Sequence, residues 1–176
     1  MKLVVFSDNH RDKDVVNWIV IHNPDADRLI SLGDSEMKEH ELSSMGIFGV
    51  KGNYPFEPDF PNELVMEFED IRFFITHGHR YFVKTGFYNI QSALESRNCD
   101  VALFGHTHQA IIEKVDHRLL LNPGSTTHPK LGAFKTYMII EVIKRIIAIE
   151  IREVYTDQLI RKHIETLPPR REPYGF

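Results

Sequence analysis

The sequence predicts an α/β protein with a parallel sheet in its first half and a second half rich in antiparallel strands. Across residues 1–53, short apolar runs alternate with segments of helical periodicity, which is the pattern of a parallel sheet with crossover helices. Beyond the proline-rich stretch 54–63, apolar runs occur in pairs separated by short polar turns, which is typical of hairpins. The length of 176 residues fits one domain. We expect it over 1–165, followed by a C-terminal tail over 166–176.

The individual elements follow from periodicity and from residues that start or stop helices. Asp12 is a plausible N-cap for the first helix, and Pro24 closes it. The segment 156–169 fits either a short helix or a strand with a tail. Before it, the expected order is strand 2–6, helix 12–23, strand 27–33, helix 36–44, strand 46–53, loop 54–63, hairpin 64–79 turning at 69–70, helix 85–98, strand 100–104, hairpin 109–125 turning at 116–117, and two strands within 136–154 turning near 144–145.

Composition narrows the class of protein. The formal net charge is −4 and the pI is about 6.2, so no basic field favours strong binding of nucleic acid. The single cysteine, Cys99, excludes an intramolecular disulfide, fits a reducing compartment, and is interpreted as a small buried apolar residue. The apolar run at the start is too short for a signal peptide or a membrane span. We therefore expect a cytoplasmic protein without membrane association.

Polar side chains gather where apolar runs end. In a parallel α/β sheet, the carboxyl ends of the strands are where binding sites form. Taken singly, an aspartate or asparagine in such a place is more often a turn residue, and a histidine often only satisfies backbone groups. Here eight such residues all follow apolar runs, and a chance occurrence of this pattern is a poor explanation. The residues in question are Asp8, His10, Asp34, Asn53, His77, His79, His106 and His108.

These side chains have the chemistry of a site for two metal ions. Two divalent cations about 3.5–4 Å apart can bind both the attacking and the leaving side of a phosphoryl group. Close cations repel one another, so an anionic ligand such as an aspartate is needed between them. Histidine nitrogens and an amide oxygen complete the coordination without excess negative charge. Such mixed sets suit manganese, iron, zinc or nickel better than magnesium or calcium.

Six short motifs, taken together, resemble those of the calcineurin-like metallophosphoesterases, and specifically the small single-domain phosphodiesterases of the YfcE type. The motifs occur in the family's order along nearly the whole chain: "FSDNH", "LGDSE", "VKGNY", "THGH", "FGHTHQA" and "LNPGS". The resemblance implies a four-layer fold, in which two mixed β-sheets form a sandwich flanked by helices. This agrees with the element order above.

The resemblance also implies which residues hold the metals and how the reaction proceeds. It implies a phosphodiesterase in which a hydroxide bridging the metals attacks phosphorus in line, without a covalent enzyme intermediate. It implies catalytic roles for Asp34 and Asn53. Manganese is the first expectation for the two ions, with nickel, zinc or iron as alternatives. One ion would be held by Asp8, His10, Asp34 and His108, and the other by Asp34, Asn53, His77 and His106, with Asp34 bridging.

The chain departs from the family pattern after Asn53. Tyr54 stands where the larger family has a histidine that is thought to stabilise the transition state or protonate the leaving group. We expect Tyr54 and His79 to contact the substrate. His79, two residues after the ligand His77, is a candidate to take over part of the missing catalytic role. The alternative is that His79 only supports a ligand or faces solvent. The "NPGS" motif, Asn122 to Ser125, fits either a loop that shapes the site or a simple turn.

A second hypothesis is that the protein is a non-catalytic scaffold and not an enzyme. A retromer subunit of this fold has lost part of the ligand set and serves as a protein-interaction scaffold. Here every ligand position is filled by a competent side chain, which favours the enzyme. The expected partner is a small phosphodiester substrate, and a homo-oligomer is expected by family tendency alone. The remaining histidines, expected at the surface, are His22, His40, His117, His128 and His163, of which His128 lies closest to a motif.

Overall fold

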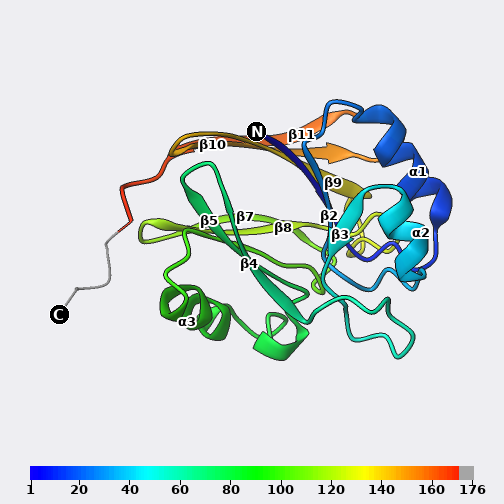
Figure 1. The fold of residues 1–176 in the computed structure, drawn as a ribbon, viewed down its shortest axis with the longest axis horizontal. Coiled ribbons are helices and arrows are strands. Elements are labelled where there is room, and N and C mark those ends of the chain that lie inside the picture. Colours follow the sequence, from blue (N-terminus) through cyan, green and yellow to red (C-terminus); the bar gives the residue numbers. More distant parts are fainter. Residues whose placement is uncertain (171–176) are drawn as a thin grey trace.

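The computed structural model describes residues 1–170, which form eleven strands, three α-helices and one turn of 3₁₀-helix (Figure 1). The strands are β1 (Lys2–Phe6), β2 (Arg28–Ser31), β3 (Ile47–Gly49), β4 (Glu63–Phe68), β5 (Ile71–Thr76), β6 (Val101–Leu103), β7 (Ala110–Val115), β8 (Arg118–Pro123), β9 (Thr136–Ile143), β10 (Ile146–Glu153) and β11 (Leu159–Thr166). The helices are α1 (Lys13–His22), α2 (Glu39–Ser44), η1 (His79–Tyr81) and α3 (Tyr88–Ser96).

The strands form two mixed sheets, as predicted. The six-stranded sheet has the order β11-β10-β9-β1-β2-β3, in which β1, β2 and β3 are parallel and β9, β10 and β11 join antiparallel. The five-stranded sheet has the order β4-β5-β6-β8-β7. Its central strands β5, β6 and β8 are parallel, and β4 and β7 pair antiparallel at its edges. The predicted hairpins β4–β5 and β7–β8 are confirmed. The prediction did not include the parallel pairing of β5, β6 and β8 at the middle of this sheet.

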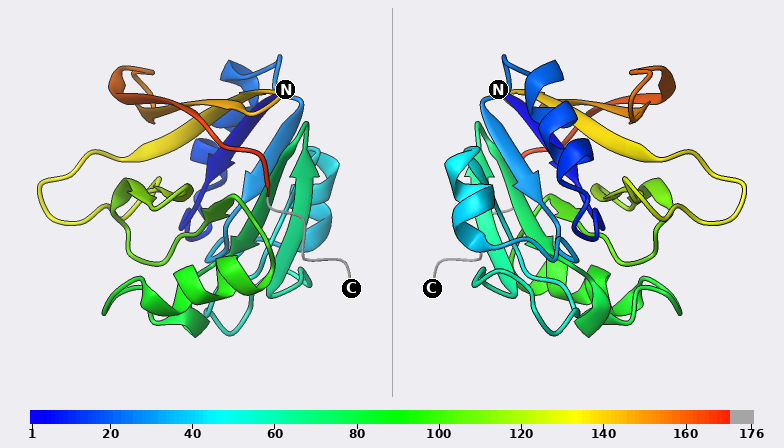
Figure 2. Two further views of the ribbon diagram at one scale, coloured as in Figure 1. Left: turned by 90° about the vertical axis from the view of Figure 1, so that its left-hand side faces the viewer. Right: turned by 90° about the vertical axis from the view of Figure 1, so that its right-hand side faces the viewer.

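Side-chain alternation along the strands produces the layers. In β1, Leu3 and Val5 join the core between the two sheets, whereas Val4 and Phe6 pack in a second core with α1. In the other sheet, Phe73 of β5 joins the core between the sheets, and its neighbour Phe74 packs with α3. Because both faces of these strands are buried, their sequences are continuous apolar runs. Figure 2 shows the resulting stack, with α1 above the two sheets and α3 below them.

Most of the predicted elements are confirmed. Asp12 caps α1, because its Oδ1 accepts a hydrogen bond of 3.0 Å from the backbone N–H of Val15. The ambiguous segment 156–169 contains a strand, β11, and no helix. Cys99 is buried, as expected. Of the five histidines expected at the surface, four have exposed side chains, while His163 is only partly exposed.

The end of the described chain is packed against the domain. β11 continues to Thr166, and Leu167 is buried in the core between the sheets. Arg170 forms a bidentate ion pair with Glu67, at 2.8 and 2.9 Å. The rest of the predicted tail, residues 171–176, lies outside the described residues. Within residues 1–170, no helix is long and apolar enough to cross a membrane.

Candidate metal centre

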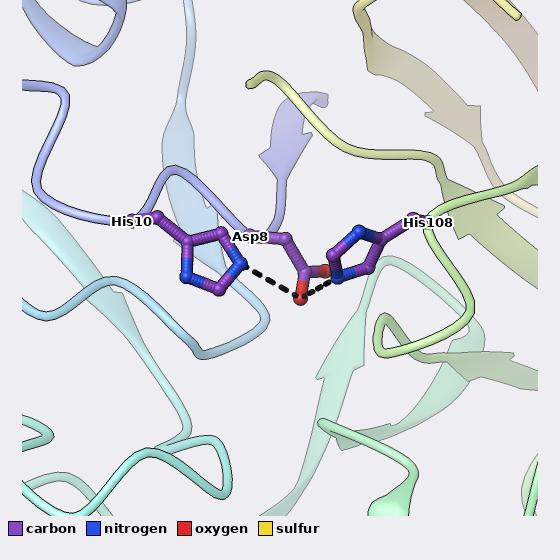
Figure 3. Close-up of side chains that lie close together, drawn as sticks. All are labelled: Asp8, His10 and His108. Carbon is purple, nitrogen blue, oxygen red and sulfur yellow. Dashed lines mark ion pairs between the residues drawn. The ribbon is translucent and has the colours of Figure 1, made fainter. Parts of the chain in front are cut away.

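A first cluster of potential metal ligands joins the two sheets. Asp8 and His10 follow β1 of the six-stranded sheet, and His108 follows β6 of the five-stranded sheet. The ligand atoms of these three side chains lie within 4.8 Å of one another. Asp8 Oδ1 is 3.1 Å from Nε2 of His108 and 4.0 Å from Nε2 of His10 (Figure 3).

Both imidazoles of this cluster are held through their outer nitrogen. Nδ1 of His10 lies 2.7 Å from Oε1 of Glu36, and Nδ1 of His108 lies 2.6 Å from the carbonyl oxygen of His128. Since a carbonyl or carboxylate oxygen accepts a hydrogen bond, each Nδ1 is the donor and Nε2 is the nitrogen that faces the cluster. Histidines that bind metals show this arrangement, because the outer hydrogen bond fixes the tautomer and the ring orientation.

Asp8 is the anionic centre of the cluster and is completely buried. Its Oδ2 accepts hydrogen bonds from Ser7 Oγ at 2.5 Å and from the backbone N–H of His106 at 3.3 Å. Its Oδ1 accepts no hydrogen bond from any residue that the structure describes. A buried oxygen without a hydrogen-bond donor is costly, and a cation between Asp8 and the two histidines would satisfy it. The donor set of this cluster therefore fits a divalent metal.

A second cluster lies beside the first and also draws on both sheets. Asp34 follows β2, whereas His77 and His106 follow β5 and β6, and their ligand atoms lie within 4.8 Å of one another. Nε2 of His77 is 3.5 Å from Asp34 Oδ2 and 3.2 Å from Oδ1 of Asn53. Nδ1 of His77 donates to the carbonyl oxygen of Leu32 at 2.7 Å, so Nε2 is the nitrogen that faces the cluster and would bind a cation after losing its proton.

The carboxylate of Asp34 is oriented by the loop after β3. Its Oδ1 accepts hydrogen bonds from the backbone N–H groups of Asn53 at 2.8 Å and Tyr54 at 3.1 Å. Gly52 permits this close approach, because a Cβ atom at that position would lie only 2.0 Å from Asp34 Oδ1. With Oδ1 engaged in this way, Oδ2 is the oxygen that faces His77 and remains for a cation.

Glu57 connects the two loops that carry Asp34 and Asn53. Its carboxylate accepts hydrogen bonds from the backbone N–H groups of Gly52 at 2.9 Å, Glu36 at 3.0 Å and Ser35 at 3.4 Å. Burial, followed by the nearby charge of Asp34, raises the pKa of Glu57 despite these hydrogen bonds. Glu57 is a positioning residue of the second cluster.

The charges at the centre are arranged for cation binding. Burial opposes ionisation of Asp8, but contacts with His108 and the charge of His77 outweigh it, so the pKa of Asp8 is lowered. Asp34 behaves in the same way, with His77 holding its pKa well below the usual range. Burial, reinforced by the charge of His77, lowers the pKa of His106 to about 4. At neutral pH the centre therefore offers two carboxylates and at least one neutral imidazole.

The backbone at the centre is strained. Five of the predicted ligands have φ between 40° and 66°, the left-handed region that residues with a Cβ rarely adopt. Such conformations cost roughly 1–3 kcal/mol each and concentrate at functional sites. Their presence at successive strand ends supports a functional origin. The five residues are Asp8, His10, Asp34, His106 and His108.

The "NPGS" motif holds these loops in place and is more than a turn. Nδ2 of Asn122 donates to the carbonyl oxygen of Gly105 at 2.8 Å and to Oγ1 of Thr107 at 3.0 Å. Oγ of Ser125 donates to the carbonyl oxygen of Asp8 at 3.0 Å. The motif thereby connects the loop of His106 and His108 with the loop of Asp8 and His10.

The structure brings all seven predicted ligands to one region, although the sharing of Asp34 between two ions stays a prediction. His79 lies beside the second cluster, with its ring centroid 5.4 Å from that of His77 and 6.1 Å from that of His106. Burial lowers the pKa of His79. The hydroxyl of Tyr54 accepts a hydrogen bond of 3.0 Å from Nη2 of Arg11, which fixes the ring next to Asn53.

Three supporting residues were not identified from the sequence. Glu36 had no predicted role, yet its carboxylate holds His10. His128 was expected only at the surface, but its carbonyl oxygen holds His108 and its ring lies 5.0 Å from that of His10. Glu57 was part of a loop without an assigned role. The position of His128 three residues after "NPGS" was the one signal available in the sequence.

The fold and the two clusters define a metal-binding protein of the phosphoesterase type. Residues 1–145 match the calcineurin-like phosphoesterase superfamily domain. The chain belongs to this superfamily. It is 31% identical over 141 residues to the probable metallophosphoesterase YsnB of Bacillus subtilis, which covers 80% of this chain and 83% of YsnB. It is 30% identical over 161 residues to the phosphodiesterase MJ0936 of Methanocaldococcus jannaschii, covering 77% of this chain and 93% of that protein.

Solved structures show the same fold. A predicted phosphoesterase from Streptococcus pneumoniae superposes with a TM-score of 0.81 and 25% identity, over 93% of this chain and 97% of the other. Vps29 from Entamoeba histolytica superposes with a TM-score of 0.76 and 16% identity, over 96% of this chain and all of the other chain. The chain is thus a metallophosphoesterase homologue whose fold is also found in Vps29.

Proposed function

We propose that the protein is a metal-dependent phosphodiesterase with a dinuclear centre. The observation that supports this most directly is the pair of adjacent ligand clusters, in which carboxylates meet imidazoles whose outer nitrogens are already engaged. Asp8, His10 and His108 would hold one cation. Asp34, Asn53, His77 and His106 would hold the other, with Asp34 shared. When bound, two divalent cations supply a hydroxide nucleophile at neutral pH and offset negative charge on the phosphoryl oxygens.

Residues of the chain supply the remaining functions. Asn53 presents an amide oxygen at the second cluster while its backbone N–H orients Asp34. Burial lowers the pKa of His79, which favours the neutral ring, and one ring N–H can donate a hydrogen bond to a phosphoryl or leaving-group oxygen. The Tyr54 hydroxyl accepts from Arg11, which leaves its own hydrogen free to contact the substrate.

The donor set also bears on which metal is bound. The clusters combine imidazole nitrogens with carboxylate and amide oxygens, and the lone cysteine lies elsewhere, beside α3. This mixture favours first-row transition metals over calcium and magnesium. Manganese is our first choice for the native ion, and nickel, zinc and iron are compatible with the same ligands.

The test is hydrolysis by metal-stripped protein after single ions are added back. The substrates are bis(4-nitrophenyl) phosphate and 4-nitrophenyl phosphate, with manganese, nickel, zinc and magnesium added in turn. We expect a transition metal to restore cleavage of the diester in preference to the monoester. Asp34→Asn should abolish it, whereas Asp116→Asn, at the exposed β7–β8 turn, should retain it.

The second candidate is a non-catalytic scaffold of the same fold. The likeness to Vps29 concerns the fold alone, and both ligand clusters here are complete. If none of the four ions restores hydrolysis while the protein binds metal, the enzyme proposal is wrong and the scaffold becomes the better interpretation.

A further inference from the structure

A cavity of about 640 Å³ opens beside the metal centre, on the side of His106 and His108. One wall is the segment 83–87, which leads from η1 into α3. Another part of the lining is formed by residues 128–130, after the "NPGS" motif. A molecule bound at the centre through a phosphoryl group would thus have its remaining part directed into this space. We call this cavity the lysine pocket, after Lys84 and Lys130 in its walls.

The lysine pocket is positively charged in a chain whose net charge is −4. Lys84 and Lys130 line it from two separate segments of the chain, and His128 adds a third nitrogen-bearing side chain. No carboxylate among residues 1–170 lines this cavity. A second cavity, by contrast, has a lining of mixed charge, in which Lys2 and Arg152 occur together with Glu141, Glu150 and Asp157.

The two lysines are available for a ligand. Some lysines elsewhere on the surface are paired with carboxylates, for example Lys114 with Glu165 at 3.1 Å and Lys162 with Glu150 at 2.9 Å. Lys130 Nζ contacts the neutral Oε1 of Gln109 at 3.3 Å. Lys84 is exposed and forms no ion pair with any described carboxylate. It lines the same cavity as His106 and His108, which belong to the two ligand clusters.

The pocket also has an apolar part. Phe87 and Ile111, both partly buried, also line the pocket. This combination suits a short carbon skeleton that places a charged end group near the ammonium groups. Lysine is a common point-charge ligand for phosphate, and two lysines without a competing carboxylate favour a doubly charged phosphate monoester over a singly charged group.

We propose that the lysine pocket binds a second phosphate group on one arm of the substrate, so that the preferred substrates are phosphodiesters with a terminal phosphate monoester. This proposal rests on the proposed phosphodiesterase function and names its substrate class. Lys84 and Lys130 act as specificity-determining residues. They contact the terminal phosphate and not the phosphorus that is attacked.

The test compares three 4-nitrophenyl phosphodiesters that differ in one arm: a neutral propyl arm, a 3-phosphopropyl arm and a cationic choline arm. We expect kcat/KM to be roughly tenfold higher for the 3-phosphopropyl ester than for the propyl ester, as for one charge-assisted hydrogen bond, and lowest for the choline ester. Lys84→Ala and Lys130→Ala should each reduce this preference severalfold, and Lys84→Arg should retain most of it. Lys144→Ala, at the β9–β10 turn, is the matched control and should leave the preference unchanged.

A binding measurement separates this proposal from the proposed function. Propane-1,3-diyl bisphosphate is titrated into the metal-free protein by calorimetry, with the Lys84→Ala variant alongside. Binding that requires Lys84 supports the pocket even if no metal restores hydrolysis. Hydrolysis of all three diesters with equal kcat/KM, or a preference that survives both alanine substitutions, would overturn the pocket while leaving the phosphodiesterase proposal intact.

Discussion

Nε2 of His108 lies 3.1 Å from Oδ1 of Asp8, and this contact joins the loop after β1 in one sheet to the loop after β6 in the other. The imidazole is fixed from behind by the carbonyl oxygen of His128, while the carboxylate oxygen has no hydrogen-bond donor among the described residues. The pair therefore holds a buried negative charge that a cation in the first cluster would balance.

Replacing the carboxylate of Asp8 should remove one bound ion. Asp8→Asn leaves the shape nearly unchanged but removes the negative charge of the first cluster. We expect manganese affinity at this cluster to fall by more than roughly 100-fold, since even partners that only orient a ligand are worth 10–100-fold. Equilibrium dialysis should then give one manganese per chain in place of two. Asp116→Asn serves as control, and two retained equivalents in Asp8→Asn would contradict the assignment.

Glu57→Gln tests the positioning of the second cluster. The glutamine side chain has nearly the same volume, but only one of its terminal atoms accepts hydrogen bonds from the N–H groups of Gly52 and Glu36. We expect a loss of about 1–3 kcal/mol in the free energy of unfolding, measured by urea denaturation, together with weaker metal binding. Glu113→Gln, on the exposed side of β7, should change neither quantity. A Glu57→Gln variant as stable as its parent would exclude the role.

Gly52→Ala tests the close approach of the β3 loop to Asp34. The new methyl group would lie 2.0 Å from Asp34 Oδ1, so either the carboxylate or the loop must move. We expect loss of metal at the second cluster, with the first cluster retained. Gly46→Ala is a demanding control, because its methyl group meets open space but its backbone has φ of 73°. If both variants bind two metals, the approach has no functional consequence.

Metal affinity should rise with pH through the neutral range. Contact with Asp8 raises the pKa of His108, and contacts with Asp34 and Asp8 raise that of His77 against the effect of burial. Below these raised pKa values the imidazoles carry a proton that a cation must displace, and above them the lone pair is free. Affinity should therefore change by up to about tenfold per pH unit for each proton displaced, from pH 6 to pH 8. Calorimetry in buffers with different ionisation enthalpies would count the protons, and none released would refute the assignment.

His79→Ala tests whether His79 replaces the family's missing histidine. A hydrogen-bond donor to the reacting group contributes roughly 100-fold or more to kcat, whereas a merely structural residue would leave the pH profile unaltered. We expect a lower kcat for the diester with little change in KM, and a pH profile that loses the limb due to His79. His117→Ala, on an exposed turn, is the matched control. Unchanged kcat and KM in His79→Ala would end the hypothesis.

The sequence was sufficient to predict which side chains gather at the centre, because each lies within a few residues of the end of a buried strand. It was also sufficient for the hairpins, whose turns at Glu69-Asp70 and Asp116-His117 interrupt strong alternation. It did not reveal that β5, β6 and β8 run parallel, since strand order depends on pairings between distant segments.

The supporting contacts were beyond prediction for a different reason. The acceptors that orient His77 and His108 are backbone carbonyl oxygens, of Leu32 and His128, which every residue possesses. Glu57 acts on backbone N–H groups across a loop, again without a pattern of residue types. Such contacts are defined by the fold and not by the local sequence.

Each cluster takes ligands from both sheets: Asp8, His10 and Asp34 follow strands of the six-stranded sheet, and His77, His106 and His108 follow strands of the other. A coordinated ion would consequently cross-link the two sheets at the end where the clusters lie. Chelators should then lower the melting temperature as well as the catalytic rate, because saturation at 100 times the dissociation constant adds about 2.7 kcal/mol per independent site. For such a molecule, scarcity of metal in its surroundings would shorten its lifetime against proteolysis, so the supply of the ion would set how much of the protein persists.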